Sequence, residues 1–113
     1  MDDILAAAEN LAALIRNSDE VANFLAARKQ LALDPALTAQ VDAFQEAHQG
    51  LSAGLLHTGR PGIEEERAIS GQYADLMLHP DAREYLRAER SLLDLMGRVL
   101  DTVARSVEGI VEV

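Results

Sequence analysis

The fold of this chain is decided by residues 80–111, which read PDAREYLRAERSLLDLMGRVLDTVARSVEGIV. Apolar residues recur here in steps of three, four or seven, a spacing that places them on one side of an α-helix. They form two neighbouring rows, which are Tyr85, Leu92, Met96, Val99, Val103 and Ile110 in the first and Leu86, Leu93, Leu100, Ala104, Val107 and Val111 in the second. The stripe is too wide for a two-stranded seam, so it predicts one unbroken helix that several others cover. At ~1.5 Å per residue it would reach ~48 Å, so we expect something outside the chain's own core to cover part of it.

Length and composition favour a single helical domain. The 113 residues suffice for one domain with its own core, and only two phenylalanines and two tyrosines are aromatic. Alanine and aliphatic residues dominate, whereas a sheet core is usually richer in β-branched and aromatic residues. We therefore predict an all-α fold of four to five amphipathic helices in an antiparallel bundle, with a long C-terminal helix and one domain over residues 1–113.

Charge and cysteine content argue against several functions. The formal net charge is −9, whereas nucleic acids and anionic membrane surfaces both select a positive face, so we expect neither as a direct partner. The chain has no cysteine, which excludes disulfides, thiolate catalysis and thiolate-held metal clusters. The N-terminus lacks a signal-peptide pattern, and no apolar run approaches the ~20 residues that span a bilayer. We expect a cytoplasmic protein that does not insert into membranes.

Turn signals divide the remainder of the chain into four further helices. Ser18 is a good N-cap, and Asp34-Pro35 is the sharpest boundary because proline suits the first helical position. His79-Pro80 ends the fourth helix, since the residue before proline is pushed out of the α region. The predicted helices run from Ile4 to about Arg16, from Asp19 to Leu31, from about Ala36 towards Leu56, and from Glu64 to the His79-Pro80 boundary.

A coiled-coil-like seam follows the third helix. Its members recur in alternating steps of four and three and are Leu37, Val41, Phe44, His48, Leu51 and Leu55. The seam is more regular than packing within one chain requires. We therefore predict a homodimer or higher oligomer, with the seam either at the interface or against the C-terminal helix that forms it. On this apolar row, His48 is predicted to be packed and hydrogen-bonded.

One segment of the chain echoes another. Val21, Phe24, Leu25, Ala27 and Leu31 have the same spacing as Ala82, Tyr85, Leu86, Ala88 and Leu92, sixty-one residues later. Either the two segments pack as equivalent faces, or they resemble each other only as any two amphipathic helices do. The matching positions of Phe24 and Tyr85 predict that both aromatic side chains anchor the core.

The sequence contains no recognisable catalytic pattern. No histidine follows a glutamate at the three-residue spacing of di-iron bundles, and no serine is flanked by the glycines of a nucleophile elbow. We predict no catalytic residue, no cofactor and no metal ligand. Two alternatives to a regulatory protein remain open. One is a hydrolase or metal enzyme that uses His48 with nearby carboxylates, and the other is a structural helical oligomer.

The order of these signals resembles the YlbF/YmcA family of small helical bacterial proteins over nearly the whole chain. The resemblance rests on Phe24-x-x-Ala27-x-x-x-Leu31, Asp34-Pro35, Val41-x-x-Phe44, His79-Pro80 and Tyr85-x-x-Ala88-Glu89-x-x-Leu92. It implies an all-helical fold and a non-enzymatic regulatory role, because studied members regulate competence, sporulation and biofilm formation and influence RNA processing with partner proteins. Some members carry cysteines linked to iron–sulfur clusters. That property does not extend to this cysteine-free chain.

From the seam, the echo and the resemblance, we expect assembly with itself and with other regulatory proteins. The candidate packing or interaction residues are Phe24, Leu37, Val41, Phe44, His48, Leu51, Leu55, Tyr85, Leu92, Met96 and Val99.

Overall fold

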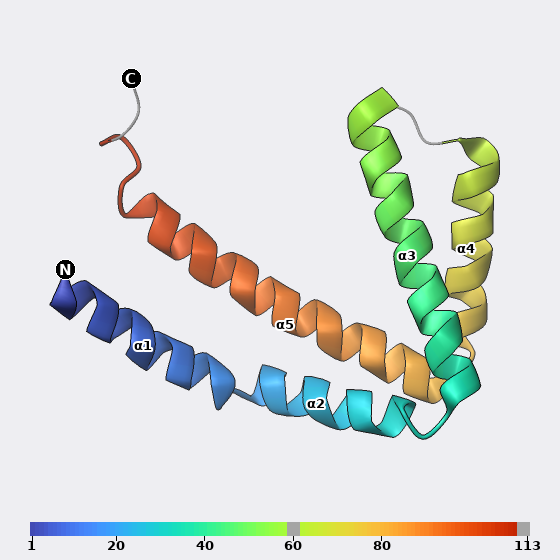
Figure 1. Ribbon diagram of the computed structural model, residues 1–113, viewed down its shortest axis with the longest axis horizontal. Coiled ribbons are helices and arrows are strands. Elements are labelled where there is room, and N and C mark those ends of the chain that lie inside the picture. Colours follow the sequence, from blue (N-terminus) through green and yellow to red (C-terminus); the bar gives the residue numbers. More distant parts are fainter. Residues whose placement is uncertain (59–61, 111–113) are drawn as a thin grey trace. The chain divides into compact units, whose positions relative to one another are not determined.

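Five helices make up the described part of the chain. The computed structural model describes the backbone of residues 1–58 and 62–110 and the side chains of residues 1–50 and 62–110. The helices are α1 (Asp2–Arg16), α2 (Asp19–Leu31), α3 (Pro35–Thr58), α4 (Ile63–Met77) and α5 (Pro80–Arg105) (Figure 1). None of the described residues lies in a strand. The prediction of an all-α fold with four to five helices is therefore confirmed.

Side chains satisfy the backbone at the break between α1 and α2. The backbone N–H of Val21 donates to Ser18 Oγ at 3.3 Å, as expected for an N-cap serine. The Ser18 hydroxyl in turn donates to the Ile15 carbonyl at 2.6 Å, and the Asn17 side-chain amide donates to the Ala13 carbonyl at 2.9 Å. The same two carbonyls also accept the backbone N–H groups of Asn17, at 3.1 Å to Ala13, and of Ser18, at 3.0 Å to Ile15.

The boundary between α2 and α3 is built around Asp34. Its Oδ1 accepts a hydrogen bond of 3.0 Å from the backbone N–H of Leu37, and Pro35 is the first residue of α3. The Thr38 hydroxyl lies 3.0 Å from the Leu31 carbonyl and 2.9 Å from the Asp34 carbonyl. The aspartate cap therefore starts α3 while the Thr38 side chain reaches the last turn of α2.

A short turn joins α4 to α5 at the predicted His79-Pro80 boundary. The backbone N–H of His79 donates to the Leu76 carbonyl at 3.0 Å, and that of Arg83 donates to the His79 carbonyl at 2.9 Å. An Arg83 guanidinium nitrogen also donates to the Met77 carbonyl at 3.3 Å. A cationic donor at a helix C-terminus is favourable because of the negative end of the helix dipole.

The long C-terminal helix ends earlier than predicted. α5 stops at Arg105, and turns follow over residues 106–110, so the prediction of an unbroken helix to about Val111 is wrong. The Ser106 hydroxyl donates to the Val103 carbonyl at 2.6 Å, which competes with helical hydrogen bonding there. Gly109 has a φ of +82°, a left-handed conformation that glycine adopts easily. Val111 lies outside the described residues.

The chain divides into two compact units, and α2 and α5 each contribute to both. The central unit is Ala27–Tyr85, and the terminal unit combines Met1–Ala26 with Leu86–Val113. Within the central unit, α3 and α4 pack against each other as an antiparallel hairpin (Figure 1). Within the terminal unit, α1 and the second part of α5 run side by side in opposite directions (Figure 1).

Burial differs sharply between the two units. The buried apolar residues of the central unit are Ala27, Leu31, Leu37, Val41, Phe44, Leu76 and Ala82, whereas Ala88 is the one such residue among the described part of the terminal unit. α1 has no buried residue at all. The central unit therefore contains a conventional core, and the terminal unit leaves much of its apolar surface in water.

Candidate functional site

The first half of the α3 seam belongs to the core of the central unit. Leu37, Val41 and Phe44 are all buried, and Val41 retains only 1% of its accessible surface. The Phe44 ring lies 5.7 Å from that of Tyr73 on α4. These three seam residues therefore stabilise the hairpin and are not available to a partner. The side chains of Leu51 and Leu55, which continue the predicted seam, lie outside the described residues.

His48 is exposed in the single chain, so packing of its side chain at an interface stays a prediction. Its imidazole lies 6.0 Å from the Phe44 ring, tilted by 38°, and thus covers the outer side of that buried residue. Tyr73, on the other side of Phe44, is itself 49% exposed, so the hairpin core thins out at this level. The seam spacing assigns His48 to the same row of α3 as Phe44. Spacing does not predict how far α4 covers that row.

The echoed segments agree in burial at two of their five matched positions. Phe24 and Tyr85 are both half-buried and each has interaction partners, so the prediction that they anchor the core stays a prediction. The most enclosed matching pair is Ala27 and Ala88, at 6% and 4% exposure. Small side chains at these positions let neighbouring structure approach the helix backbone closely. Sequence reasoning gave weight to the aromatics and missed the alanines.

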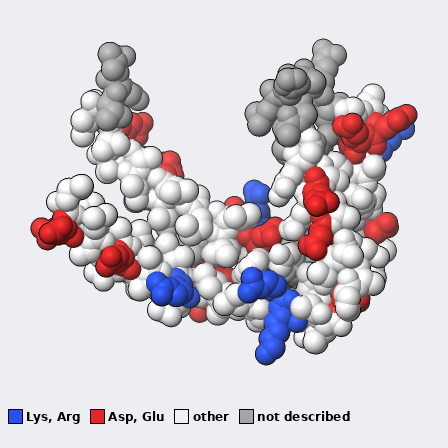
Figure 2. All heavy atoms as spheres, viewed as in Figure 1, with Lys and Arg blue, Asp and Glu red and all other residues white. Residues whose placement is uncertain are grey.

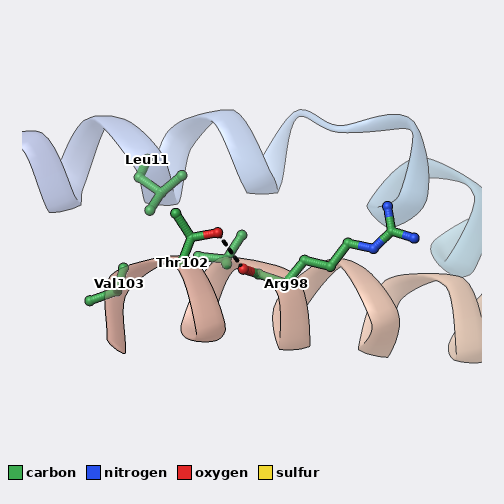
Figure 3. Close-up of a pocket in the computed structure, with 5 residues that line it drawn as sticks. Leu11, Arg98, Thr102 and Val103 are labelled. Atoms are coloured by element: carbon green, nitrogen blue, oxygen red, sulfur yellow. Dashed lines mark hydrogen bonds between the residues drawn. The ribbon is translucent and has the colours of Figure 1, made fainter. Parts of the chain in front are cut away.

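The α5 candidates Leu92, Met96 and Val99 are all half-buried. Val99 helps to line an open apolar depression of about 210 Å³ between α1 and α5, together with Leu11, Arg98, Thr102 and Val103 (Figure 3). Leu11 points from α1 toward α5, whereas the Arg98 side chain extends along α5 away from it (Figure 3). The Thr102 hydroxyl already donates to the Arg98 carbonyl at 2.8 Å. The depression is smaller than the ~300–1,000 Å³ typical of ligand pockets, so we interpret it as loose packing between the two helices.

A second apolar row of α5 faces water. In this row, Leu93 and Leu100 are 59% and 65% exposed, and Val103 of the first row, which borders the depression, is 58% exposed. On α1, the side chains of Ile4, Leu5 and Leu14 are also exposed. The wide stripe in the sequence contained both rows of α5, but spacing alone does not indicate which row α1 covers. Leu93 and Leu100 were therefore missed as candidates for interaction.

The polar face of α5 carries arginine and aspartate side chains that form ion pairs. An Arg90 guanidinium nitrogen lies 3.3 Å from an Asp94 carboxylate oxygen, and Arg105 and Asp101 approach to 2.9 Å. All four side chains are more than half exposed, so these pairs contribute little to stability. They do keep the charge along this face balanced.

Chemistry-bearing side chains do not cluster in the described part of the chain. No group of three or more histidine and acidic side chains there is arranged to hold a metal ion. The acidic residues in the first turn of α4, Glu64, Glu65 and Glu66, are all exposed. Among the helices searched, none combines the length and apolar character needed to cross a membrane.

Comparison with known proteins identifies a family over nearly the whole chain. The family model described as control of competence regulator ComK, YlbF/YmcA, matches residues 4–108. The chain belongs to this YlbF/YmcA family.

Two bacterial relatives are similar to the chain along most of its length. The chain is 28% identical over 101 residues to UPF0342 protein STH1710 of Symbiobacterium thermophilum, which covers 89% of this chain and 90% of the relative. It is 25% identical over 108 residues to a UPF0342 protein of Caldicellulosiruptor bescii, with 96% and 91% covered. No significant match was found among solved structures. The relatives are thus similar along almost their whole length, and their names assign no reaction.

Proposed function

We propose that this protein is a non-enzymatic regulatory or adaptor protein that works in the cytoplasm by helix-mediated assembly, with itself and with other regulatory proteins. The observation that carries this proposal is the exposed apolar surface of the terminal unit, on α1 and α5. Large exposed apolar patches usually mark interaction surfaces, because leaving them in water is unfavourable. Membership of a family described by control of the regulator ComK supports a regulatory purpose for that surface.

The central unit supports this proposal by supplying a stable base. Its buried residues close the α3–α4 hairpin, and the Asp34 cap fixes the start of α3. The chain therefore has a core, and the exposed apolar surface of the terminal unit does not reflect a failure to fold. A structured chain with one exposed apolar unit is the arrangement expected of an assembly protein.

A pull-down tests the proposal against a structural oligomer with no regulatory role. The tagged chain is added to a native extract of its source organism, and captured proteins are identified by mass spectrometry. The wild-type chain is compared with Leu5→Glu/Leu14→Glu, which alters two exposed side chains of α1. We expect a stoichiometric partner other than the chain itself, reconstituted from purified components and weakened by the double variant. Capture of nothing but further copies of the chain would contradict a regulatory role.

The enzyme alternative requires a separate measurement. Metal content after native purification and hydrolase activity on broad ester and phosphoester substrates are compared between the wild-type chain and His48→Ala. His48 is exposed, so its replacement should leave the fold intact. Stoichiometric zinc or iron, or a hydrolytic rate, that disappears in His48→Ala would overturn the non-enzymatic proposal.

A further inference from the structure

We propose that the exposed row of α5 formed by Leu93, Leu100 and Val103 is the surface on which a second copy of this chain docks. The inference rests on the proposed function, because it names the site and the partner of helix-mediated assembly. It moves the expected self-contact from the α3 seam, whose first half is buried in the hairpin, to the terminal unit.

The geometry of α5 separates two apolar sides. Leu92, Leu95 and Val99 are half-buried, and Val99 shares a depression with Leu11 of α1. On the neighbouring side, Leu93, Met96 and Leu100 follow one another in steps of three and four. Val103 comes three residues later and lies at the border of the two sides, because it also lines the depression. These steps are the alternation of positions a and d in a helical seam, which another helix of the same period can match. Of the four, Met96 is half-buried and the other three are exposed.

The exposed area suits a symmetric pair. Val107 and Ile110 extend the apolar surface into the turns after α5 and are 45% and 75% exposed. With Leu93, Leu100 and Val103, they present on the order of 500 Å² per chain. A symmetric pair that covers all of it would bury on the order of 1,000 Å² in total, which is about the minimum for a biological interface. Left in water, the same side chains would form an apolar patch as large as the largest on a typical monomer, and such patches are often functional.

Charge favours an identical helix as the occupant. α5 contains five arginines and five acidic residues and is therefore formally neutral, so the net charge of −9 resides entirely on other parts of the chain. Acidic residues gather instead in the first turns of α1 and α4 (Figure 2). A second copy can therefore approach α5 without the like-charge repulsion that it would meet at those helix starts. The Arg90–Asp94 and Asp101–Arg105 pairs line the polar face with both signs, which also suits a neutral, amphipathic partner helix.

Gly97 is consistent with close approach of another helix. It lies one turn after Leu93 and one turn before Leu100, and a Cβ placed on it would have no neighbour within 4 Å. Nothing in the single chain requires a glycine here, although glycine costs a helix interior about 1 kcal/mol relative to alanine. A partner backbone that packs closely beside the row would require a small residue at this position.

Light scattering coupled to gel filtration tests the docking surface. The wild-type chain is compared with Leu93→Glu/Leu100→Glu and with Leu33→Glu, which changes a leucine of the central unit that is 74% exposed. We expect more than one chain per particle for the wild type and Leu33→Glu at micromolar concentration. We expect one chain per particle for the double variant, with unchanged helical circular dichroism. A monomeric wild type, or a double variant that assembles as the wild type does, would overturn the proposal.

Cross-linking provides an independent test that does not depend on how well the double variant folds. Because the chain has no cysteine, each introduced thiol reports only its own contacts. The samples to be oxidised are Leu93→Cys, Leu100→Cys and an equimolar mixture of the two. The control is Ser91→Cys, which places a thiol on the opposite, exposed side of α5. A disulfide needs Cα atoms within ~7 Å, so at least one row sample should form covalent dimers faster than Ser91→Cys. Equal rates in all samples would contradict docking on this row.

Failure of self-docking can be distinguished from failure of the proposed regulatory function. If the pull-down finds a regulatory partner while the wild-type chain is monomeric, the adaptor proposal survives and the self-docking proposal fails. If the chain pairs through α5 but captures no other protein, the docking surface stands and the regulatory role fails.

Discussion

The ring of Phe44 on α3 lies 5.7 Å from the ring of Tyr73 on α4, with the two planes tilted by 41°. Phe44 is 8% exposed, whereas Tyr73 keeps half of its surface in water. The pair therefore marks the level at which the hairpin core passes from closed to open. His48, one turn beyond Phe44 on α3, lies on the open side.

Phe44→Ala should strongly destabilise the central unit. Removal of a buried phenylalanine side chain usually costs about 3–5 kcal/mol, because transfer free energy is lost and a cavity remains. His48→Ala, which alters an exposed neighbour on the same row, should change the unfolding free energy by less than ~0.5 kcal/mol. Urea unfolding followed by circular dichroism checks both. Equal midpoints for the two variants would show that Phe44 does not anchor the hairpin.

Larger side chains at the enclosed alanines of the echo should also destabilise the chain. Ala27→Leu and Ala88→Leu insert three carbon atoms where the alanine is almost fully buried, and such overpacking typically costs ~1–3 kcal/mol. Ala22→Leu, at an exposed position of α2, is the matched control and should be nearly neutral. The thermal midpoints of the three variants provide the measurement. If Ala88→Leu matched Ala22→Leu, close packing at the second copy of the echo would be ruled out.

Several features of the fold were predictable from the sequence because they depend on local chemistry. Ser18 and Asp34 accept the backbone hydrogen bonds expected of caps, and the prolines at 35 and 80 open α3 and α5. Helical periodicity likewise predicted the apolar rows. The end of α5 was missed, because the Ser106 side-chain hydrogen bond and the left-handed Gly109 outweigh an apolar pattern that continues to Val111.

The candidate site was less predictable because it depends on which neighbour covers each row. The spacing predicts a seam that includes Leu37, Val41 and Phe44. In the structure these residues are buried in the α3–α4 hairpin. His48 has the same periodicity but is exposed, since spacing along one helix says nothing about how far the next helix extends over it. Leu93 and Leu100 were recognised as apolar but not as exposed. That distinction appears only when α1 is seen to lie beside the other row of α5.

The cap at Asp34 offers a local test of how α3 begins. Asp34→Ala removes the acceptor for the Leu37 N–H and should cost about 1 kcal/mol of stability. Asp34→Asn keeps an oxygen acceptor of similar capping strength, so it should recover most of that loss. Chemical denaturation of the three proteins at one ionic strength provides the comparison. Asparagine and alanine variants of equal stability would show that the side-chain bond is not what stabilises the cap.

Two glycines with open surroundings should respond in opposite directions to alanine. In a monomeric sample, Gly97→Ala should stabilise the chain by about 0.5–1 kcal/mol, because it lies inside α5 and an added Cβ meets nothing within 4 Å. Gly109→Ala also meets no atom, but the φ of +82° disfavours any side chain, so this variant should be less stable than wild type. Thermal unfolding at low concentration separates the two. A Gly97→Ala variant that lost stability as a monomer would show that the glycine is needed within the single chain.

The central structural claim is that this chain assembles with itself through α5, and the mass of the particle in solution tests it most directly. Sedimentation equilibrium of the wild-type chain, from low to high micromolar concentration, measures that mass without a label or a column matrix. We predict a mass of at least two chains that falls toward one chain on dilution, and a mass of one chain throughout for Leu93→Glu/Leu100→Glu. A wild-type protein that remains a single chain across the whole range would contradict the account.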